Sequence, residues 1–213
     1  VAHGYQPGRR IFLPNQDVFQ VVPAVNEQID EQCYRPVLLG SEPLPAGFIF
    51  SLYTPLREWM RKSHPQEFAQ MREKIQQMPE REYSVLGDPF VHVILPLLPS
   101  EDQHMLLRIG RAAFIADFGF EPKGLWLPET AVSRHTLTLA RNNGYEFVAL
   151  RDSQLISTEQ NPMYIHLDKG QDMAVFHFDT GLSGDVSFNP WATMNADNFL
   201  KDWVSTNRPF AVI

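Results

Sequence analysis

Glu129 is the residue of this sequence that is best placed to do covalent chemistry. It follows Trp126, Leu127 and Pro128, directly after an apolar segment, at the point where we expect a helix to begin. The positive end of a helix dipole favours an ionised carboxylate, which is the form that acts as a nucleophile. The alternative interpretation is a carboxylate that only caps the helix. Trp126 could stack on a sugar ring or belong to the core.

Several other polar residues stand at or just beyond the expected carboxyl ends of strands: His3, Gln6, His92, Asp179 and Asp185. Neutral imidazoles at His3 and His92 could hydrogen-bond substrate hydroxyl groups, or be satisfied within the core. His3, His92 and Asp185 are a conceivable metal set, but no His-x-x-x-His or His-Glu-x-x-His spacing supports one. We therefore expect no metal. Four other histidines do not stand at the end of an apolar stretch and are expected at the surface, namely His64, His104, His135 and His166.

The sequence alternates short apolar runs with longer amphipathic stretches, which indicates strand–helix units and a parallel sheet. The expected strands are 1–2, 48–50, 91–95, 124–127, 147–150, 186–188 and 210–213. The expected helices are 54–78, 100–118, 129–143 and 195–203. Two alternating segments, 163–167 and 173–178, flank a turn and predict an inserted hairpin.

These units predict an α/β fold, a parallel (β/α)7-type distorted barrel that forms a single domain over residues 1–213. Because the chain starts at Val1 and ends in an apolar run, we expect this barrel to be truncated at both ends. A flat doubly wound sheet is the alternative, since periodicity does not show closure. In a barrel the loops that follow the strands meet at one mouth, so the polar residues above would share one site.

Composition excludes several classes of function. The chain is 44% hydrophobic and 20% charged, with a net charge of −7, and lacks the basic face that a nucleic-acid partner requires. Its densest basic stretch, 57–74, is interleaved with glutamates and predicts a solvated helix face. Cys33 is the only cysteine, which rules out an internal disulfide and fits a cytoplasmic location. No apolar run is long enough for a membrane span, and no nucleotide-binding motif implies a cofactor. Nothing in the sequence indicates the oligomeric state of the protein.

Several segments in order along the chain resemble glycoside hydrolase family 57, in particular a branch whose first motif reads His-x-Tyr-Gln-Pro. They are His3-Gly4-Tyr5-Gln6-Pro7, His92-Val93-Ile94-Leu95-Pro96-Leu97, Gly124-Leu125-Trp126-Leu127-Pro128-Glu129-Thr130-Ala131 and Leu182-Ser183-Gly184-Asp185-Val186-Ser187-Phe188. Asn26-Glu27 and Glu31-Gln32-Cys33-Tyr34-Arg35-Pro36 match as well. The segment that contains Glu129 is the most specific of these.

The resemblance implies a retaining hydrolase or glucanotransferase on α-linked oligo- or polysaccharides, with Glu129 as nucleophile. It implies that the substrate-binding residues are His3, Gln6, His92, Trp126 and Asp185. The family's general acid, an aspartate after the seventh strand, is expected beyond residue 213, and neither Asp179 nor Asp185 matches it. Two other functions stay open. One is a non-catalytic carbohydrate-binding barrel, and the other is a metal-dependent polysaccharide deacetylase, against which the missing metal-ligand motifs count.

Overall fold

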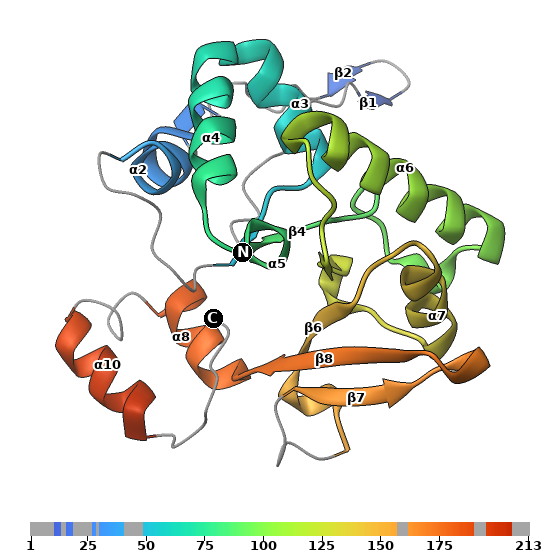
Figure 1. Ribbon diagram of the computed structural model, residues 1–213. Coiled ribbons are helices and arrows are strands. Elements are labelled where there is room, and N and C mark those ends of the chain that lie inside the picture. The colour runs from blue at the N-terminus through green and yellow to red at the C-terminus, as the bar shows by residue number, and fades with distance from the viewer. Residues whose placement is uncertain are drawn as a thin grey trace.

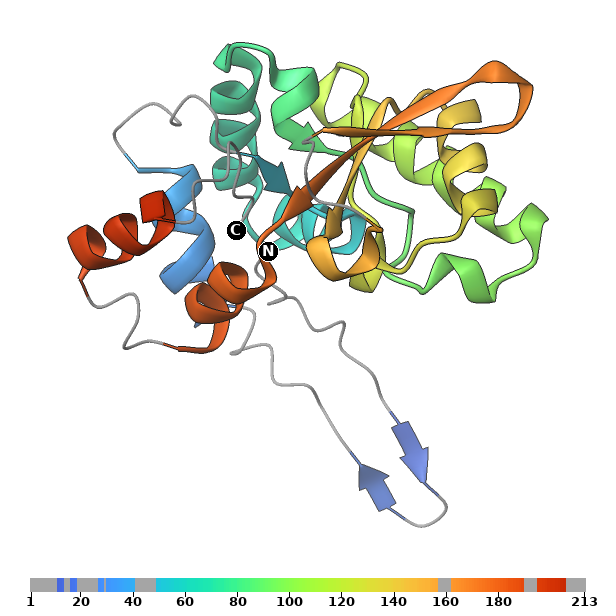
Figure 2. The ribbon, with the colours of Figure 1, turned by 90° about the horizontal axis from the view of Figure 1, so that it is seen from below.

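The computed structural model describes residues 11–13, 16–18, 27–28, 30–40, 49–156, 162–189 and 195–205. The expected strands 1–2 and 210–213, together with His3 and Gln6, lie outside the described residues. Near the start, β1 (Ile11–Leu13) and β2 (Gln16–Val18) form a short antiparallel hairpin. This hairpin stands apart from the other helices and strands (Figure 2).

A mainly parallel arrangement of strands runs through the rest of the molecule (Figure 1). In pairing order the strands are β3 (Phe50–Ser51), β4 (Val85–Leu86), β5 (Gly124–Leu125), β6 (Phe147–Arg151), β8 (Asp172–Phe178) and β7 (Met163–His166). A parallel bridge between Gly87 and Leu125 links β4 to β5, and only β7 is antiparallel to its neighbour. The prediction of an α/β fold with a parallel sheet is therefore confirmed.

Helices connect these strands and cover them (Figure 1). The α-helices are α2 (Arg35–Leu38), α3 (Thr54–Ser63), α4 (Pro65–Gln77), α5 (Arg81–Ser84), α6 (Ser100–Phe118), α7 (Arg134–Asn142), α8 (Thr180–Phe188) and α10 (Ala196–Ser205). Short helices of other types are η1 (Asp30–Tyr34), η2 (Leu95–Leu97), η3 (Pro128–Thr130), η4 (Asp152–Gln154) and η5 (Asp168–Gly170). None of the described helices combines the length and the apolar character needed to cross a bilayer.

The prediction for α6 is confirmed at both ends. The helix spans Ser100–Phe118 and stops at Gly119, whose φ of 79° is a left-handed conformation that glycine adopts without strain. The expected helix 54–78 is instead two helices, because α3 ends at Ser63 and α4 starts at Pro65. Proline disfavours helical geometry in the residue before it, and His64 accordingly has φ −133° and ψ 59°.

Two of the predicted strands are wrong. Residues 91–95 lie in a loop that enters η2, and the strand of this unit is β4, which ends before Gly87. Residues 186–188 belong to α8, whose first turn is capped by Asp179: its carboxylate accepts a hydrogen bond from Leu182 N at 3.0 Å. The hairpin β7–β8 was expected, but β8 also pairs in parallel with β6, so it supplies a strand of the main sheet.

Buried side chains form two apolar clusters. The first lies among β3, α3, α4 and the end of α6 and includes Leu56, Met71 and Phe114. The second lies among α6, α7 and the strands β5, β6 and β8, and includes Leu125 and Val148. Full burial of one such side chain contributes about 1.5–3 kcal/mol. These clusters hold the helices against the strands and thereby fix where each strand ends.

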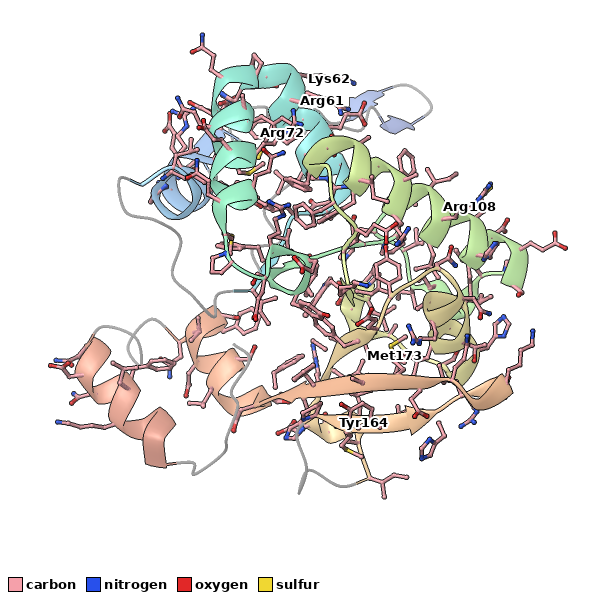
Figure 3. The ribbon with its side chains drawn as sticks, viewed as in Figure 1. Arg61, Lys62, Arg72, Arg108, Tyr164 and Met173 are labelled. Carbon is pink, nitrogen blue, oxygen red and sulfur yellow. The ribbon has the colours of Figure 1, made fainter. Side chains whose placement is uncertain are left out.

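Arg57 contradicts the prediction that 57–74 is a solvated face, because its side chain is 0% exposed. It donates hydrogen bonds to four acceptors, which are Asp117 Oδ2 at 2.8 Å, Asp88 Oδ1 at 2.9 Å, Thr54 Oγ1 at 2.9 Å and the Leu52 carbonyl. The charge of Arg57 is thus paired inside the protein. Later in α3, Arg61 and Lys62 do lie on the outer side of the helix, as expected (Figure 3).

Gly110 of α6 packs closely against the backbone of residues 88–90, which follow β4. A Cβ at this position would stand 2.1 Å from the Asp88 carbonyl oxygen and 2.7 Å from Phe90 N. Both neighbours are backbone atoms, so they cannot rotate away as a side chain could. We expect Gly110→Ala to lower the free energy of unfolding by about 1–3 kcal/mol, measured by urea denaturation.

Gly184 of α8 is the matched control for Gly110, because a Cβ there meets no atom within 4 Å. Alanine has the higher helix propensity, so Gly184→Ala is expected to raise the free energy of unfolding by up to about 1 kcal/mol. Equal stability of the Gly110→Ala and wild-type proteins would contradict the close approach of α6 to residues 88–90.

Candidate active site

The carboxyl ends of the parallel strands bring several polar side chains to one edge of the sheet. Tyr53 follows β3, His92 follows β4, Glu129 follows β5, Gln154 follows β6 and Asp179 follows β8. Ligands of parallel α/β folds bind at this edge, because the loops there vary without disturbing the core. The structure therefore places His92 and Glu129, both named as candidates from the sequence, at this edge.

Glu129 and His92 lie beside each other. Glu129 Oε1 is 3.6 Å from His92 Nε2, and the two side chains are 60% and 29% exposed. This separation is too long for a hydrogen bond, so the carboxylate is not neutralised by a tight partner at this contact. The imidazole packs against Tyr53, with ring centroids 5.7 Å apart. The arrangement presents an accessible carboxylate next to an imidazole whose orientation is set by an aromatic neighbour.

Glu129 occupies a left-handed turn, with φ 57° and ψ 16°, and Thr130 follows with φ 53°. A non-glycine residue in this region costs roughly 1 kcal/mol or more, and such residues occur at functional sites. The turn also corrects the prediction that a helix starts at Glu129. Helix α7 starts at Arg134, after Ser133, whose side chain accepts a hydrogen bond from Thr136 N at 3.0 Å. Glu129 therefore does not lie at the N-terminus of α7, where the helix dipole would act on it.

Hydrogen bonds from two sides hold this turn. Within it, Thr130 N donates to the Leu127 carbonyl at 2.9 Å and Thr130 Oγ1 donates to the Glu129 carbonyl at 2.7 Å. From η4, Gln154 Nε2 donates to the Thr130 carbonyl at 2.8 Å, while its Oε1 accepts from Arg151 N at 2.9 Å. Gln154 thus fastens the turn that carries Glu129 to the end of β6. Gln154 was not predicted as a site residue, because its only signal in the sequence is its position just after a strand.

The loop that carries His92 is anchored at its base by Asp88. Asp88 accepts hydrogen bonds from Thr54 N at 2.7 Å and from Arg57 at 2.9 Å. Burial raises the pKa of Asp88 above its ordinary value, and the opposing charge of Arg57 is the largest effect that lowers it. At the same point the backbone N–H of Trp126 donates to the Gly87 carbonyl at 2.9 Å. The chain segments that carry His92 and Glu129 are therefore joined where they leave the sheet.

Trp126 is partly buried and stacks on Phe178, with ring centroids 6.4 Å apart and an angle of 26° between the planes. Its indole Nε1 is buried and has no hydrogen-bond partner among the described residues. A buried indole N–H usually finds an acceptor. Trp126 therefore has an indole donor close to the carboxyl edge that no described residue accepts from.

The two aspartates considered from sequence both belong to α8. Asp179 is the N-cap of that helix, and Asp185 lies in its second turn, where its side chain accepts from Asn189 Nδ2 at 3.2 Å. Asp185 was expected just after a strand, and the structure places it in a helix instead. The carboxylate of Asp179 already has a structural role at the end of β8.

Known proteins resemble this chain both in sequence and in fold. The family model for glycosyl hydrolase family 57 matches residues 6–211 of this chain. Alpha-amylase 1 of Dictyoglomus thermophilum is 28% identical over 161 residues, which is 71% of this chain and 23% of that protein. A 4-alpha-glucanotransferase of Thermococcus kodakarensis is 27% identical over 174 residues, covering 78% of this chain and 26% of that protein. The chain spans about a quarter of the length of these relatives.

Solved structures share the fold. The 4-alpha-glucanotransferase of Thermococcus litoralis matches with a TM-score of 0.65 at 22% identity, over 88% of this chain and 29% of that one. An exo-type maltose-forming amylase of Pyrococcus sp. ST04 matches with a TM-score of 0.63 at 17% identity, over 84% of this chain and 31% of that one. At these identities the likeness establishes a common fold and leaves the chemistry to be argued from the residues.

Proposed function

Because the chain belongs to glycosyl hydrolase family 57, we propose that it forms the catalytic barrel of a retaining hydrolase or glucanotransferase that acts on α-linked glucans. The observation that carries this proposal is the exposed carboxylate of Glu129 at the carboxyl edge of the sheet, 3.6 Å from His92 Nε2. The relatives named α-amylase and 4-alpha-glucanotransferase support the substrate class. We further propose that the strands close into a seven-stranded barrel and that the protein is cytoplasmic.

In the first step of this mechanism a Glu129 carboxylate oxygen attacks the anomeric carbon of the glucan. The bond from that carbon to the glycosidic oxygen breaks, and a general acid about 5 Å from the nucleophile protonates the departing oxygen. In the second step water or the hydroxyl of another sugar attacks the same carbon and releases the Glu129 carboxylate. The attacking group gives up its proton to the general acid, which lost its own proton in the first step and now acts as a base. Water yields hydrolysis and sugar yields transfer. No metal or cofactor takes part.

The geometry suits Glu129 to this role. An exposed carboxylate can approach a sugar from the open edge, and the turn fastened by Gln154 restricts where it points. His92 is placed to donate a hydrogen bond to a hydroxyl of the attacked sugar, and Trp126 to form part of the wall of that subsite. We propose His3, Gln6 and Asp185 as further substrate-binding residues. Asp179 caps α8, and neither Asp179 nor Asp185 matches the position of the family's acid, so we assign the general acid to neither.

A trapping experiment tests the nucleophile without needing the acid. Fluoride leaves without strong protonation, so 5-fluoro-α-glucosyl fluoride should glycosylate the nucleophile of a retaining enzyme and persist as an ester. We expect the wild-type protein to gain one fluoroglucosyl group, located by peptide mass spectrometry on Glu129. The Glu129→Gln variant should gain none.

Glu121 supplies a matched control, because its side chain is 61% exposed against 60% for Glu129, and it pairs with Arg111 at 2.9 Å. Glu121→Gln should leave the labelling unchanged. A label on another carboxylate would show that Glu129 is not the nucleophile. Saturable binding of maltooligosaccharides with no label would favour the non-catalytic carbohydrate-binding barrel.

A further inference from the structure

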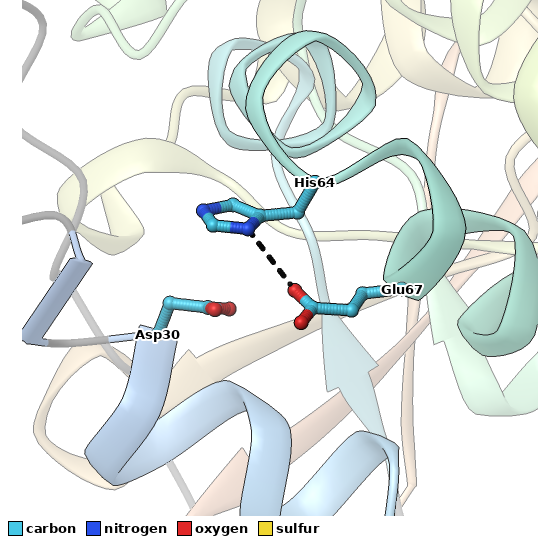
Figure 4. A group of neighbouring side chains, drawn as sticks. All are labelled: Asp30, His64 and Glu67. Carbon is cyan, nitrogen blue, oxygen red and sulfur yellow. Dashed lines mark ion pairs between the residues drawn. The ribbon is translucent and has the colours of Figure 1, made fainter.

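A second cluster of charged side chains lies away from the candidate active site, where η1 and α2 pack against α4. Asp30 of η1, His64 between α3 and α4, and Glu67 of α4 point toward one another (Figure 4). One ligand atom from each residue lies within 4.8 Å of the others. The Asp30 side chain is 0% exposed, and that of His64 is 15% exposed, which corrects the expectation that His64 is a surface residue.

Arg35 binds only one oxygen of each carboxylate in this cluster. Its Nε donates to Asp30 Oδ2 at 2.7 Å, and its Nη2 lies 3.2 Å from Glu67 Oε1. The second oxygens, Asp30 Oδ1 and Glu67 Oε2, are buried and have no hydrogen-bond partner among the described residues. Buried carboxylate oxygens are normally satisfied by a donor or a cation. Arg35 therefore orients the two carboxylates and leaves one oxygen of each available.

The imidazole of His64 lies between two carboxylates. Its Nε2 is 2.8 Å from Glu27 Oε2, and its Nδ1 is 3.2 Å from Glu67 Oε2. Nε2 makes no hydrogen bond among the described residues, and Nδ1 also lies 3.4 Å from Arg35 Nη2. With the ring proton on Nε2, the lone pair of Nδ1 faces Glu67 Oε2, and a cation between these two atoms would interact with both. A histidine that ligates a metal commonly has such a carboxylate beside its other nitrogen.

We propose that Asp30, His64 and Glu67 bind a divalent cation of the zinc class. Glu27, Asp30 and Glu67 bring three negative charges and Arg35 one positive charge, so a divalent ion balances the cluster. One imidazole and two carboxylates are ligands that zinc accepts, with a fourth position for water.

Binding would also connect parts of the chain that are distant in sequence. Zinc–ligand distances of about 2.0–2.2 Å are shorter than the present spacing allows, so the ion would draw Asp30 toward α4. Because Tyr34 packs into the apolar cluster formed with α3 and α4, the same ion would fasten η1 and α2 to that cluster. The site is independent of the proposed glycosidase chemistry.

Calorimetric titration with zinc chloride tests this site in the protein after treatment with a chelator. We expect one zinc ion per chain in the wild type and no specific binding in His64→Ala or Asp30→Asn. Glu27→Gln removes only the carboxylate beside the imidazole and should weaken binding roughly 10–100-fold. Circular dichroism without zinc checks that each variant folds. If His64→Ala or Asp30→Asn does not fold, the weaker binding expected of Glu27→Gln still tests the proposal.

His166 provides the matched control, because it is a described histidine within ion-pair distance of a carboxylate and does not belong to the cluster. Its Nδ1 is 2.5 Å from Asp172 Oδ1, and its side chain is 85% exposed. His166→Ala should leave zinc binding unchanged. Absence of binding in the folded wild type would overturn the proposal. Equal binding by wild type and all variants would also overturn it.

Discussion

A Glu129→Gly protein is expected to lose turnover of maltooligosaccharides by roughly 10⁴-fold or more, while becoming more stable to urea. The first effect follows from loss of the nucleophile. The second follows from the backbone, because Glu129 has a φ of 57°, a conformation that glycine adopts without a steric penalty. After allowing for the greater freedom of glycine in the unfolded chain, we expect a gain of about 0.5–1 kcal/mol.

Azide should restore turnover in the Glu129→Gly protein, because the small anion can enter the space left by the side chain. It would attack the anomeric carbon from the side that Glu129 normally occupies, so the expected product is a glycosyl azide of inverted anomeric configuration. Nuclear magnetic resonance of the product gives the configuration. A retained configuration would contradict direct attack by azide in place of Glu129.

Glu129→Ala separates the catalytic effect from the backbone effect. Alanine removes the carboxylate but keeps a Cβ in the left-handed turn, so activity should fall as in Glu129→Gly without the gain in stability. Urea denaturation and turnover, measured on both variants, form the comparison. Turnover by either variant at the wild-type rate would remove Glu129 from the mechanism.

Much of the helical structure could be predicted from the sequence because it depends on local signals. Helix α6 has acidic residues in its first turn and Gly119 at its end, and both limits were predicted. The strands were harder. The predicted strand 124–127 contains β5, but β4 was missed because it has two residues and periodicity does not locate so short a segment. The 186–188 strand was wrong because a cap at Asp179 favours a helix over the local apolar pattern.

The candidate site was predictable where a motif carried it and not where packing did. Glu129 and His92 were found in family-like segments, and the structure places them 3.6 Å apart. Gln154 reaches the turn through one hydrogen bond to the backbone carbonyl of Thr130. No pattern of residue types in the sequence predicts such a bond. The left-handed turn could not be predicted either, because Glu129 and Thr130 are not residue types that favour a positive φ. His3 and Gln6 stay predictions.

Arg57 was misjudged because a basic residue among glutamates in a helix is usually solvated. Its guanidinium instead lies 5.5 Å and 5.7 Å from the ring centroids of Phe114 and Phe118. Its ion pairs with Asp88 and Asp117 join α3 to the chain after β4 and to α6. The same buried network therefore stabilises the fold and supports the loop that carries His92.

The Arg57→Met variant is expected to be 3–5 kcal/mol less stable than the wild type by urea denaturation, a rough magnitude for a broken buried ion pair. Methionine can fill much of the apolar space but leaves the carboxylates of Asp88 and Asp117 buried without their partner. Arg61→Met is the matched control. Arg61 binds the same Asp117 at 2.9 Å from a side chain that is 54% exposed, so its loss should amount to less than about 1 kcal/mol.

The loss of stability in Arg57→Met should also depend on pH. Burial already raises the pKa of Asp88, and removing Arg57 takes away a charge that lowers it, so the pKa of Asp88 rises further in the variant. A group whose pKa is raised in the folded state stabilises that state below its unfolded pKa and loses this contribution as pH rises through the folded value. The variant should therefore be closest to the wild type in acid and fall behind as pH rises. A difference between the two proteins that is constant with pH would show that Asp88 does not take up the proton when Arg57 is removed.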